Sequence, residues 1–263
     1  MQVRTLITFI LIVLSNFLNS QNKEWVKNID SIFSFTTSTH FNLYSIEGHI
    51  SDETKKKVLQ ERELAYKKLS AFFETEFDVR INIFLFQNEQ LKYSTTGHKG
   101  YGWAFDNTIV EVYNDSIKVD PYHETVHILG YKITKPPAII DEGTCVYLSH
   151  LFGDKPFSKL LGYHTKSINE ILLMFNENEK TIPLAILFSY DKIEEAKNPV
   201  FAYCQSASFV RFLITHFGKG KFLKFFKSVS ISDKSDYENT FAKIYGKDFN
   251  EIEIKWKDSL GLK

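Results

Sequence analysis

The sequence predicts an α+β fold in which a small sheet comes first along the chain and helices follow. Residues 36–45 alternate as a strand would, residues 80–86 form a nearly continuous apolar run, and residues 107–113 read as another strand. From residue 151 onward the chain carries mainly helical periodicity. Strands and helices that are segregated along a chain favour the α+β class.

Residues 1–20 have the pattern of a secretory signal peptide. Arg4 precedes an apolar run at residues 6–14, and the segment closes with Asn19 and Ser20. The run is too short for a comfortable membrane span. We expect cleavage after Ser20 and export to the periplasm, the cell surface or the medium, with an uncleaved N-terminal anchor as the alternative.

The composition excludes several classes of partner. The 32 basic and 32 acidic residues cancel, so nothing implies a charge-driven nucleic-acid partner, or a membrane-surface partner after signal cleavage. The 43% hydrophobic content is enough for a sizeable core. We expect a monomer with one domain at residues 21–263.

The first half of that domain is expected to hold the sheet. We predict a short helix at residues 25–35 and a long helix at residues 53–73 with one apolar side. The strand at 80–86 is nearly all apolar, which indicates an interior position in the sheet. A glycine-rich turn at residues 97–104 precedes the strand at 107–113. It is either an ordinary hairpin turn or part of a sheet edge where a peptide pairs with free backbone groups.

The central motif is His123-Glu124-Thr125-Val126-His127, an H-E-x-x-H sequence. On a helix, positions i and i+4 share a face, so both imidazoles can reach one metal ion. Glu124 lies about 100 degrees around the helix, which suits a carboxylate that addresses water. Asp120 is a good N-cap, Pro121 suits the first turn, and the helix should stop near Gly130. The alternative is a helix that carries these residues by chance.

A second predicted helix, at residues 139–148, carries Glu142 among apolar neighbours. A carboxylate in such surroundings needs a cation or hydrogen-bond partners to stay charged. A zinc ion held by His123 and His127 would be that cation. The alternatives are that Glu142 is a surface or capping acid, or that Asp141 is the ligand instead.

These two segments together resemble the gluzincin metallopeptidases, and among them the peptidase MA-like domains. The family pattern is H-E-x-x-H followed, after a short crossover, by P-x-W-L-x-E-G-x-A, and residues 137–145 read PAIIDEGTC. Ile139 replaces the usual Trp and Cys145 the usual Ala, both packing positions. The resemblance implies a zincin-like catalytic domain, with a sheet-containing lobe at about residues 21–130 that includes the zinc helix and a helical lobe at about residues 131–263.

The resemblance also implies a mechanism. His123, His127 and Glu142 would hold one zinc ion and leave a fourth position open for water, with Glu124 as general base for hydrolysis of a peptide or protein substrate. Tyr203 matches the tyrosine that stabilises the transition state in related aminopeptidases. Its alternative is a core tyrosine on an amphipathic helix.

Two departures from the family pattern are informative. The G-x-M-E-N segment, with which the aminopeptidases hold a free amine, is absent, and this favours an endopeptidase. Val146 stands where thermolysin-like enzymes have a second acid, so another acceptor must orient the histidines. The alternative to an enzyme is a catalytically inactive, peptidase-like binding module at the cell surface or in the periplasm, although such a module would not need Glu124.

The two cysteines are Cys145 and Cys204. In an exported chain they are candidates for a disulfide beside the zinc, since each lies next to a predicted site residue. The alternative is two buried free thiols that act as small apolar residues.

Overall fold

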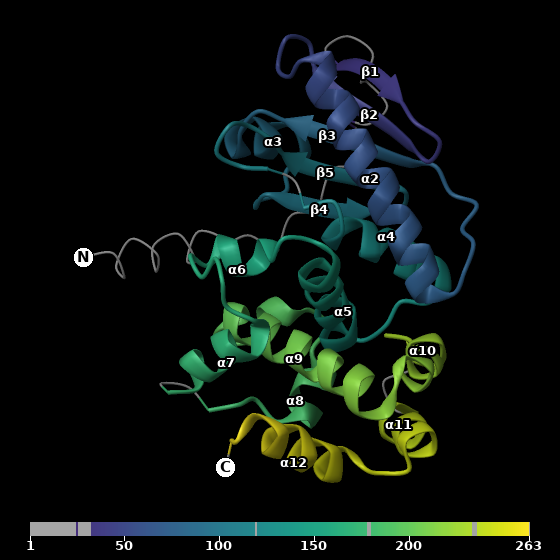
Figure 1. Cartoon of the computed structure of the whole chain (residues 1–263), viewed down its shortest axis with the longest axis vertical. Coiled ribbons are helices and arrows are strands. Elements are labelled where there is room, and N and C mark those ends of the chain that lie inside the picture. Colours follow the sequence, from purple (N-terminus) through teal and green to yellow (C-terminus); the bar gives the residue numbers. More distant parts are fainter. Residues whose placement is uncertain (1–24, 26–32, 119, 178–179, 233–235, 263) are drawn as a thin grey trace. The chain divides into compact units, whose positions relative to one another are not determined.

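The computed structural model describes residue 25 and residues 33–118, 120–177, 180–232 and 236–262 (Figure 1). The expected signal peptide lies outside these residues. The chain divides into two compact units. The first comprises residues up to Lys67 together with Asp78–Ile128, and the second comprises Lys68–Phe77 together with Leu129–Lys263.

The first unit is built on a five-stranded mixed sheet (Figure 1). Its strands in spatial order are β1 (Phe33–Thr37), β2 (Phe41–Ile46), β3 (Ile81–Phe86), β5 (Thr108–Val112) and β4 (Gly102–Phe105). The three inner strands run parallel, and the two edge strands β1 and β4 are antiparallel to their neighbours. The predicted small N-terminal sheet and the interior position of β3 are confirmed.

Two local predictions in this unit are wrong. Phe33 begins β1 and does not belong to a helix, because its ring packs edge-on against Phe84 and Phe86 of β3. The rest of the segment expected as a helix, residues 26–32, lies outside the described residues. The segment expected as one strand at 36–45 is split between β1 and β2, and the glycine-rich turn gives way to strand β4 at Gly102.

Three helices accompany the sheet: α2 (Asp52–Phe73), α3 (Glu89–Thr96) and α4 (His123–Ile133). The predicted long helix corresponds to α2, on which Leu64 is 51% exposed. The helix α3 was not predicted from the sequence. It starts where the Asn88 side chain accepts a hydrogen bond from the Leu91 N–H. The boundary between the units falls within α2 and within α4.

The helix α4 extends past Gly130, where it was expected to stop. A Cβ atom at this position would be 3.3 Å from the ring of Phe226, so a glycine lets the helix α10 (Lys219–Ser228) approach closely. Close packing therefore explains Gly130 better than helix termination does.

The second unit is helical in all its described elements. These are α5 (Ala138–Phe152), α6 (Pro156–Leu160), α7 (Ile168–Asn176), α8 (Leu184–Ser189), η2 (Ile193–Glu195), α9 (Pro199–Phe217), α10 (Lys219–Ser228), α11 (Tyr237–Tyr245) and α12 (Phe249–Leu260). Its core is rich in aromatic rings, and the buried Trp256 donates its indole N–H to Ser208 on α9. No helix among the described residues is long and apolar enough to cross a membrane.

Candidate metal centre

Four side chains of the described residues are candidate metal ligands. His123 and His127 come from α4 in the first unit, and Glu142 and Cys145 come from α5 in the second. The first three are the ligands expected from the sequence. Cys145 is an addition, since it was interpreted as a packing residue or a disulfide partner.

The two histidines lie on one face of α4. Their ring centroids are 5.2 Å apart, and the nearest pair of candidate ligand nitrogens is within 4.8 Å. His127 is buried, whereas His123 and Glu124 are half-buried. This arrangement follows from the four-residue spacing, which places the two side chains one above the other.

A buried ion pair fastens the first turn of α4 to the rest of the unit. Arg62 of α2 donates one hydrogen bond to the Thr125 hydroxyl at 3.1 Å and another, very short, to Glu111 of β5. Arg62 is completely buried. Burial raises the pKa of Glu111, and the Arg62 guanidinium opposes that rise. The network joins α2, the sheet and α4 directly beside Glu124.

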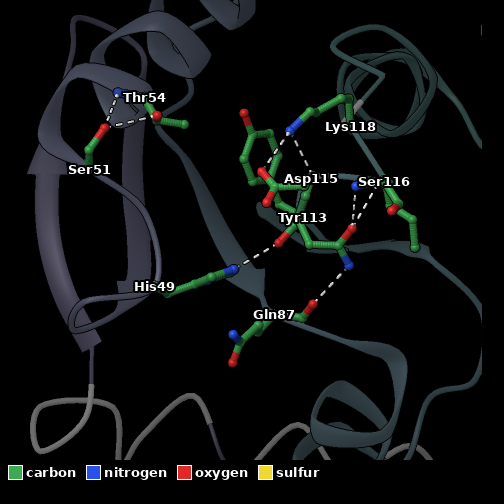
Figure 2. Close-up of polar contacts among 10 residues, drawn as sticks. His49, Ser51, Thr54, Gln87, Tyr113, Asp115, Ser116 and Lys118 are labelled. Carbon is green, nitrogen blue, oxygen red and sulfur yellow. Dashed lines mark hydrogen bonds and ion pairs between the residues drawn. The ribbon is translucent and has the colours of Figure 1, made fainter.

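The segment that leads from β5 to α4 is held by a second set of polar contacts (Figure 2). His49 contacts the Tyr113 carbonyl through its Nε2 at 2.7 Å. The Asn114 carboxamide accepts hydrogen bonds from the N–H groups of Ser116 and Ile117 and donates to the Gln87 carbonyl. These contacts fix residues 113–117, which directly follow β5.

The edge strand β4 passes directly against Glu124. A Cβ atom built on Gly102 would lie 2.3 Å from Oε1 of Glu124, closer than any real contact allows. Only a glycine leaves this space for the carboxylate. The backbone of a sheet edge therefore lies beside the predicted general base.

In the second unit, α5 presents Glu142 and Cys145 one turn apart. A carboxylate oxygen of Glu142 lies within 4.8 Å of the Cys145 sulfur. Gly143 lets α5 approach α9, since a Cβ there would be 2.6 Å from the Ser206 carbonyl oxygen. Asp141, the substitute ligand considered from the sequence, instead accepts a hydrogen bond from the Tyr131 hydroxyl at 2.6 Å.

Tyr203 stands at the start of α9, and its hydroxyl donates to Oε1 of Glu194 at 2.9 Å. Its ring packs against the buried cluster of Val146, Ile168 and Ala207. Burial raises the pKa of Glu194, and the nearby charge of Glu142 raises it further. Nothing in the sequence pointed to Glu194, because η2 has no motif of its own.

Both cysteines are buried thiols, and the candidate disulfide between them is not formed. Burial raises the pKa of Cys204 to about 12, which keeps it a neutral, inert thiol. The spacing of Cys145 from Glu142, three residues on one helix, was the signal that could have indicated a possible ligand.

The donor types fit zinc. Two imidazoles and a carboxylate are the ligand set of many catalytic zinc sites, and a thiolate is a further common zinc ligand. All four residues lie on two helices of well-defined geometry.

Solved structures with a similar fold include M1 zinc metallopeptidases. The M1 zinc metallopeptidase from Deinococcus radiodurans matches 84% of this chain with a TM-score of 0.52 and 14% identity. A mutant of it bound to a Tyr-Ser-Ala substrate matches 86% of the chain with a TM-score of 0.55 and 13% identity. The chain spans about half the length of these proteins, 48% and 51%. At these identities the likeness shows a shared fold.

No protein-family model matches the sequence. No curated protein matches it either.

Proposed function

We propose that the chain is a zinc-dependent peptidase in which His123, His127 and Glu142 hold the metal. The fold shared with M1 zinc metallopeptidases and the zinc-type donor set support this proposal. Three protein ligands leave a fourth position for water, as in catalytic zinc sites.

The observation that carries the proposal is the orientation of α4. His123, His127 and Tyr131 follow one another at four-residue spacing and so share one side of this helix. The Tyr131 hydroxyl bonds to Asp141, which directly precedes Glu142 on α5. The two imidazoles and Tyr131 therefore lie on one side of α4, and Tyr131 is bonded to the residue that precedes Glu142.

In the proposed hydrolysis, only a few residues act on the attacking water and the scissile bond. When bound, a zinc ion lowers the pKa of a coordinated water and polarises the scissile carbonyl. Glu124 takes the proton of the attacking water and later delivers it to the leaving amine. The Arg62–Glu111–Thr125 network keeps Glu124 in place while it does so.

We assign Tyr203 as donor to the oxyanion that develops on the substrate. Removal of such a donor typically costs about 2 to 4 kcal/mol of transition-state stabilisation. Glu194 already accepts the Tyr203 proton in a hydrogen bond and so fixes the direction of the hydroxyl. For catalysis the hydroxyl has to exchange this partner for the substrate oxygen.

The substrate is an extended peptide that pairs with the outer side of β4. This strand lies at the sheet edge, and its Gly102 leaves room beside Glu124. The residues of β4 are Gly102, Trp103, Ala104 and Phe105, none of them charged. An aminopeptidase needs an acid to hold the free amine of its substrate. Asp106 directly follows β4, so the endopeptidase proposal rests on the absence of the G-x-M-E-N segment and not on the composition of this strand.

A specific observation favours a second candidate, an inactive peptidase-like binding module. If the Cys145 thiolate joined the three other ligands, four protein groups would fill a tetrahedral zinc and leave no position for water. Bound zinc without hydrolysis would support that candidate.

The deciding experiment uses the chain without residues 1–20, purified and reconstituted with zinc. Casein and matched peptides with free or acetylated N-termini serve as substrates. Cleavage of internal bonds in the acetylated peptides supports the endopeptidase, and cleavage only next to free N-termini supports an aminopeptidase. Stoichiometric zinc with neither activity contradicts the peptidase proposal.

We also propose that the protein is exported, as the pattern of residues 1–20 suggests. Sequencing the N-terminus of protein from its native compartment tests this. A mature chain that begins at Gln21 supports the proposal, and one that retains Met1 in the cytoplasm contradicts it.

A further inference from the structure

Lys92 on α3 is a buried cation that no step of the proposed mechanism uses. Its side chain is 0% exposed, which is rare for lysine. Its Nζ contacts the carbonyl oxygens of His98 at 3.3 Å and Gly100 at 3.1 Å, and Nδ1 of His98 at 3.0 Å. Because an ammonium has only donors, these three acceptors satisfy its three protons.

The helix α3 also binds the backbone N–H of Gly100. The Glu89 side chain accepts a hydrogen bond from the Gly100 N–H at 3.1 Å. Glu89 and Lys92, three residues apart on α3, thus hold both backbone groups of one residue. Gly100 has a φ of +87°, a conformation that residues with a side chain rarely adopt, so this turn depends on contacts that hold it in shape.

The clamped turn leads straight to the proposed site. Tyr101 follows Gly100 and its carbonyl accepts a hydrogen bond from the Val112 N–H of β5, and Gly102 then begins β4. Gly102 lies against the Glu124 carboxylate. A single residue, Tyr101, therefore separates the clamped Gly100 from the strand position that contacts the general base.

The positive charge of Lys92 lies close to several carboxylates. Burial lowers the pKa of Lys92 to about 8, and the carboxylates of Glu124, Glu89 and Glu111 oppose that shift. An apolar side chain would fill the space without this desolvation cost, so packing alone does not account for a lysine. The residue instead supplies donors and a positive charge close to Glu124.

We infer that Lys92 is a positioning residue, which with Glu89 clamps the turn at Gly100 and so holds the edge strand β4 in register beside Glu124 for an extended peptide. This inference rests on the proposed peptidase function. The ammonium acts through the turn and does not touch the substrate.

The clamp depends on protonation, and this gives a signature that simple destabilisation lacks. The groups that face Lys92 and titrate or carry charge are Glu89 on α3, His98 in the turn, Glu111 on β5 and Glu124 on α4. A neutral amine keeps two of the three donors, so the clamp loosens as pH rises past about 8. The value of kcat/KM should fall there, since that ratio reports ionisations of the free enzyme.

The test compares Lys92→Met with Lys99→Met, using the zinc-loaded chain. Lys99 lies in the same turn, but its ammonium sits 5.5 Å from the Tyr93 ring and makes none of the clamp contacts. We expect Lys92→Met to lower kcat/KM at pH 7 by roughly tenfold or more, because small misplacements near a reacting group are costly. We also expect that kcat/KM of Lys92→Met does not fall near pH 8. Lys99→Met should keep the wild-type kcat/KM and its pH dependence.

A second readout does not need activity. Amide hydrogen exchange should accelerate across residues 98–102 in Lys92→Met and stay unchanged in β2. If Lys92→Met does not fold, Glu89→Ala takes its place, and faster exchange at the Gly100 amide is expected. Unchanged exchange in this turn, or a wild-type pH profile in Lys92→Met, overturns the inference. If the wild type binds zinc but hydrolyses nothing, the peptidase proposal fails. Amide hydrogen exchange at residues 98–102 then still tests whether Lys92 and Glu89 hold the turn at Gly100.

Discussion

Gly102 and Glu124 are in contact so close that a methyl group on Gly102 would lie 2.3 Å from Oε1 of the glutamate. Gly102 begins an edge strand and Glu124 lies in the first turn of α4. The side chain that should activate water is therefore packed against the backbone that should bind the peptide.

The first prediction is that Gly102→Ala impairs hydrolysis without unfolding the protein. The added methyl displaces the Glu124 carboxylate, and a displacement of about 1 Å can reduce the rate up to roughly 100-fold. Turnover and thermal melting are measured together. Gly220→Ala is the control, because nothing lies within 4 Å of that position. Normal turnover in Gly102→Ala would show that the carboxylate moves away at no cost.

The second prediction is that Glu124→Gln abolishes hydrolysis while zinc stays bound. The amide cannot accept a proton from water, and general-base catalysis contributes about 100-fold or more. All three proposed ligands remain intact. Zinc content and turnover are determined on the same preparation, and near-normal turnover would remove Glu124 as the base.

The third prediction concerns the ligands themselves. His123→Ala, His127→Ala and Glu142→Ala should each lower zinc occupancy strongly after dialysis, whereas His150→Ala and His164→Ala should not. Elemental analysis gives the occupancy. If Glu142→Ala retains its zinc, Asp141 is the next residue to test, although Asp141 already bonds to Tyr131.

Cys145 needs its own variant in the same series. Cobalt replaces zinc and shows a strong charge-transfer absorption only when a thiolate is a ligand. With Cys145 outside the metal's coordination, the wild type and Cys145→Ala have the same cobalt spectrum. A band that disappears in Cys145→Ala would identify a thiolate ligand and favour the binding module.

The fourth prediction is that Tyr203→Phe lowers kcat by about 100-fold, in keeping with loss of one oxyanion donor, roughly 2 to 4 kcal/mol. KM should change little, because the donor acts on the transition state. Glu194→Gln keeps an acceptor for the Tyr203 hydroxyl and should retain more activity than Tyr203→Phe. Equal kcat in the wild type and Tyr203→Phe would identify Tyr203 as a packing residue.

The fifth prediction is that the buried pair of Arg62 and Glu111 matters for stability. Arg62→Met leaves the Glu111 carboxylate buried without its cation, which costs about 3 to 5 kcal/mol of unfolding free energy. Lys57→Met on the same helix is the control. Lys57 is 74% exposed and pairs with Glu61 at 4.0 Å, a surface contact worth about 0 to 1 kcal/mol. Denaturant titration measures both, and similar costs for the two variants would contradict the prediction.

The sequence by itself determined the features that depend on neighbours along the chain. Helical periodicity requires only the local backbone, so the helix with His123 and His127 on one face, and the later helices Tyr237–Tyr245 and Phe249–Leu260, could be predicted from residue spacing. Residue spacing likewise predicted that Glu142, which directly precedes Gly143, lies on a helix.

Only the tertiary structure decided the features that depend on distant partners. Gly102 lies in a strand because β5 pairs with it, and Gly130 lies inside a helix because Phe226 needs the space. Tyr203 bonds to Glu194, and Lys92 bonds to Gly100. Both contacts arise from how the chain folds between the partners, and no periodic pattern in the sequence indicates them. A glycine can end a helix, form a turn or make room for a neighbouring side chain. Its position in the sequence does not distinguish these roles, because the role depends on which residue packs against it in the folded protein.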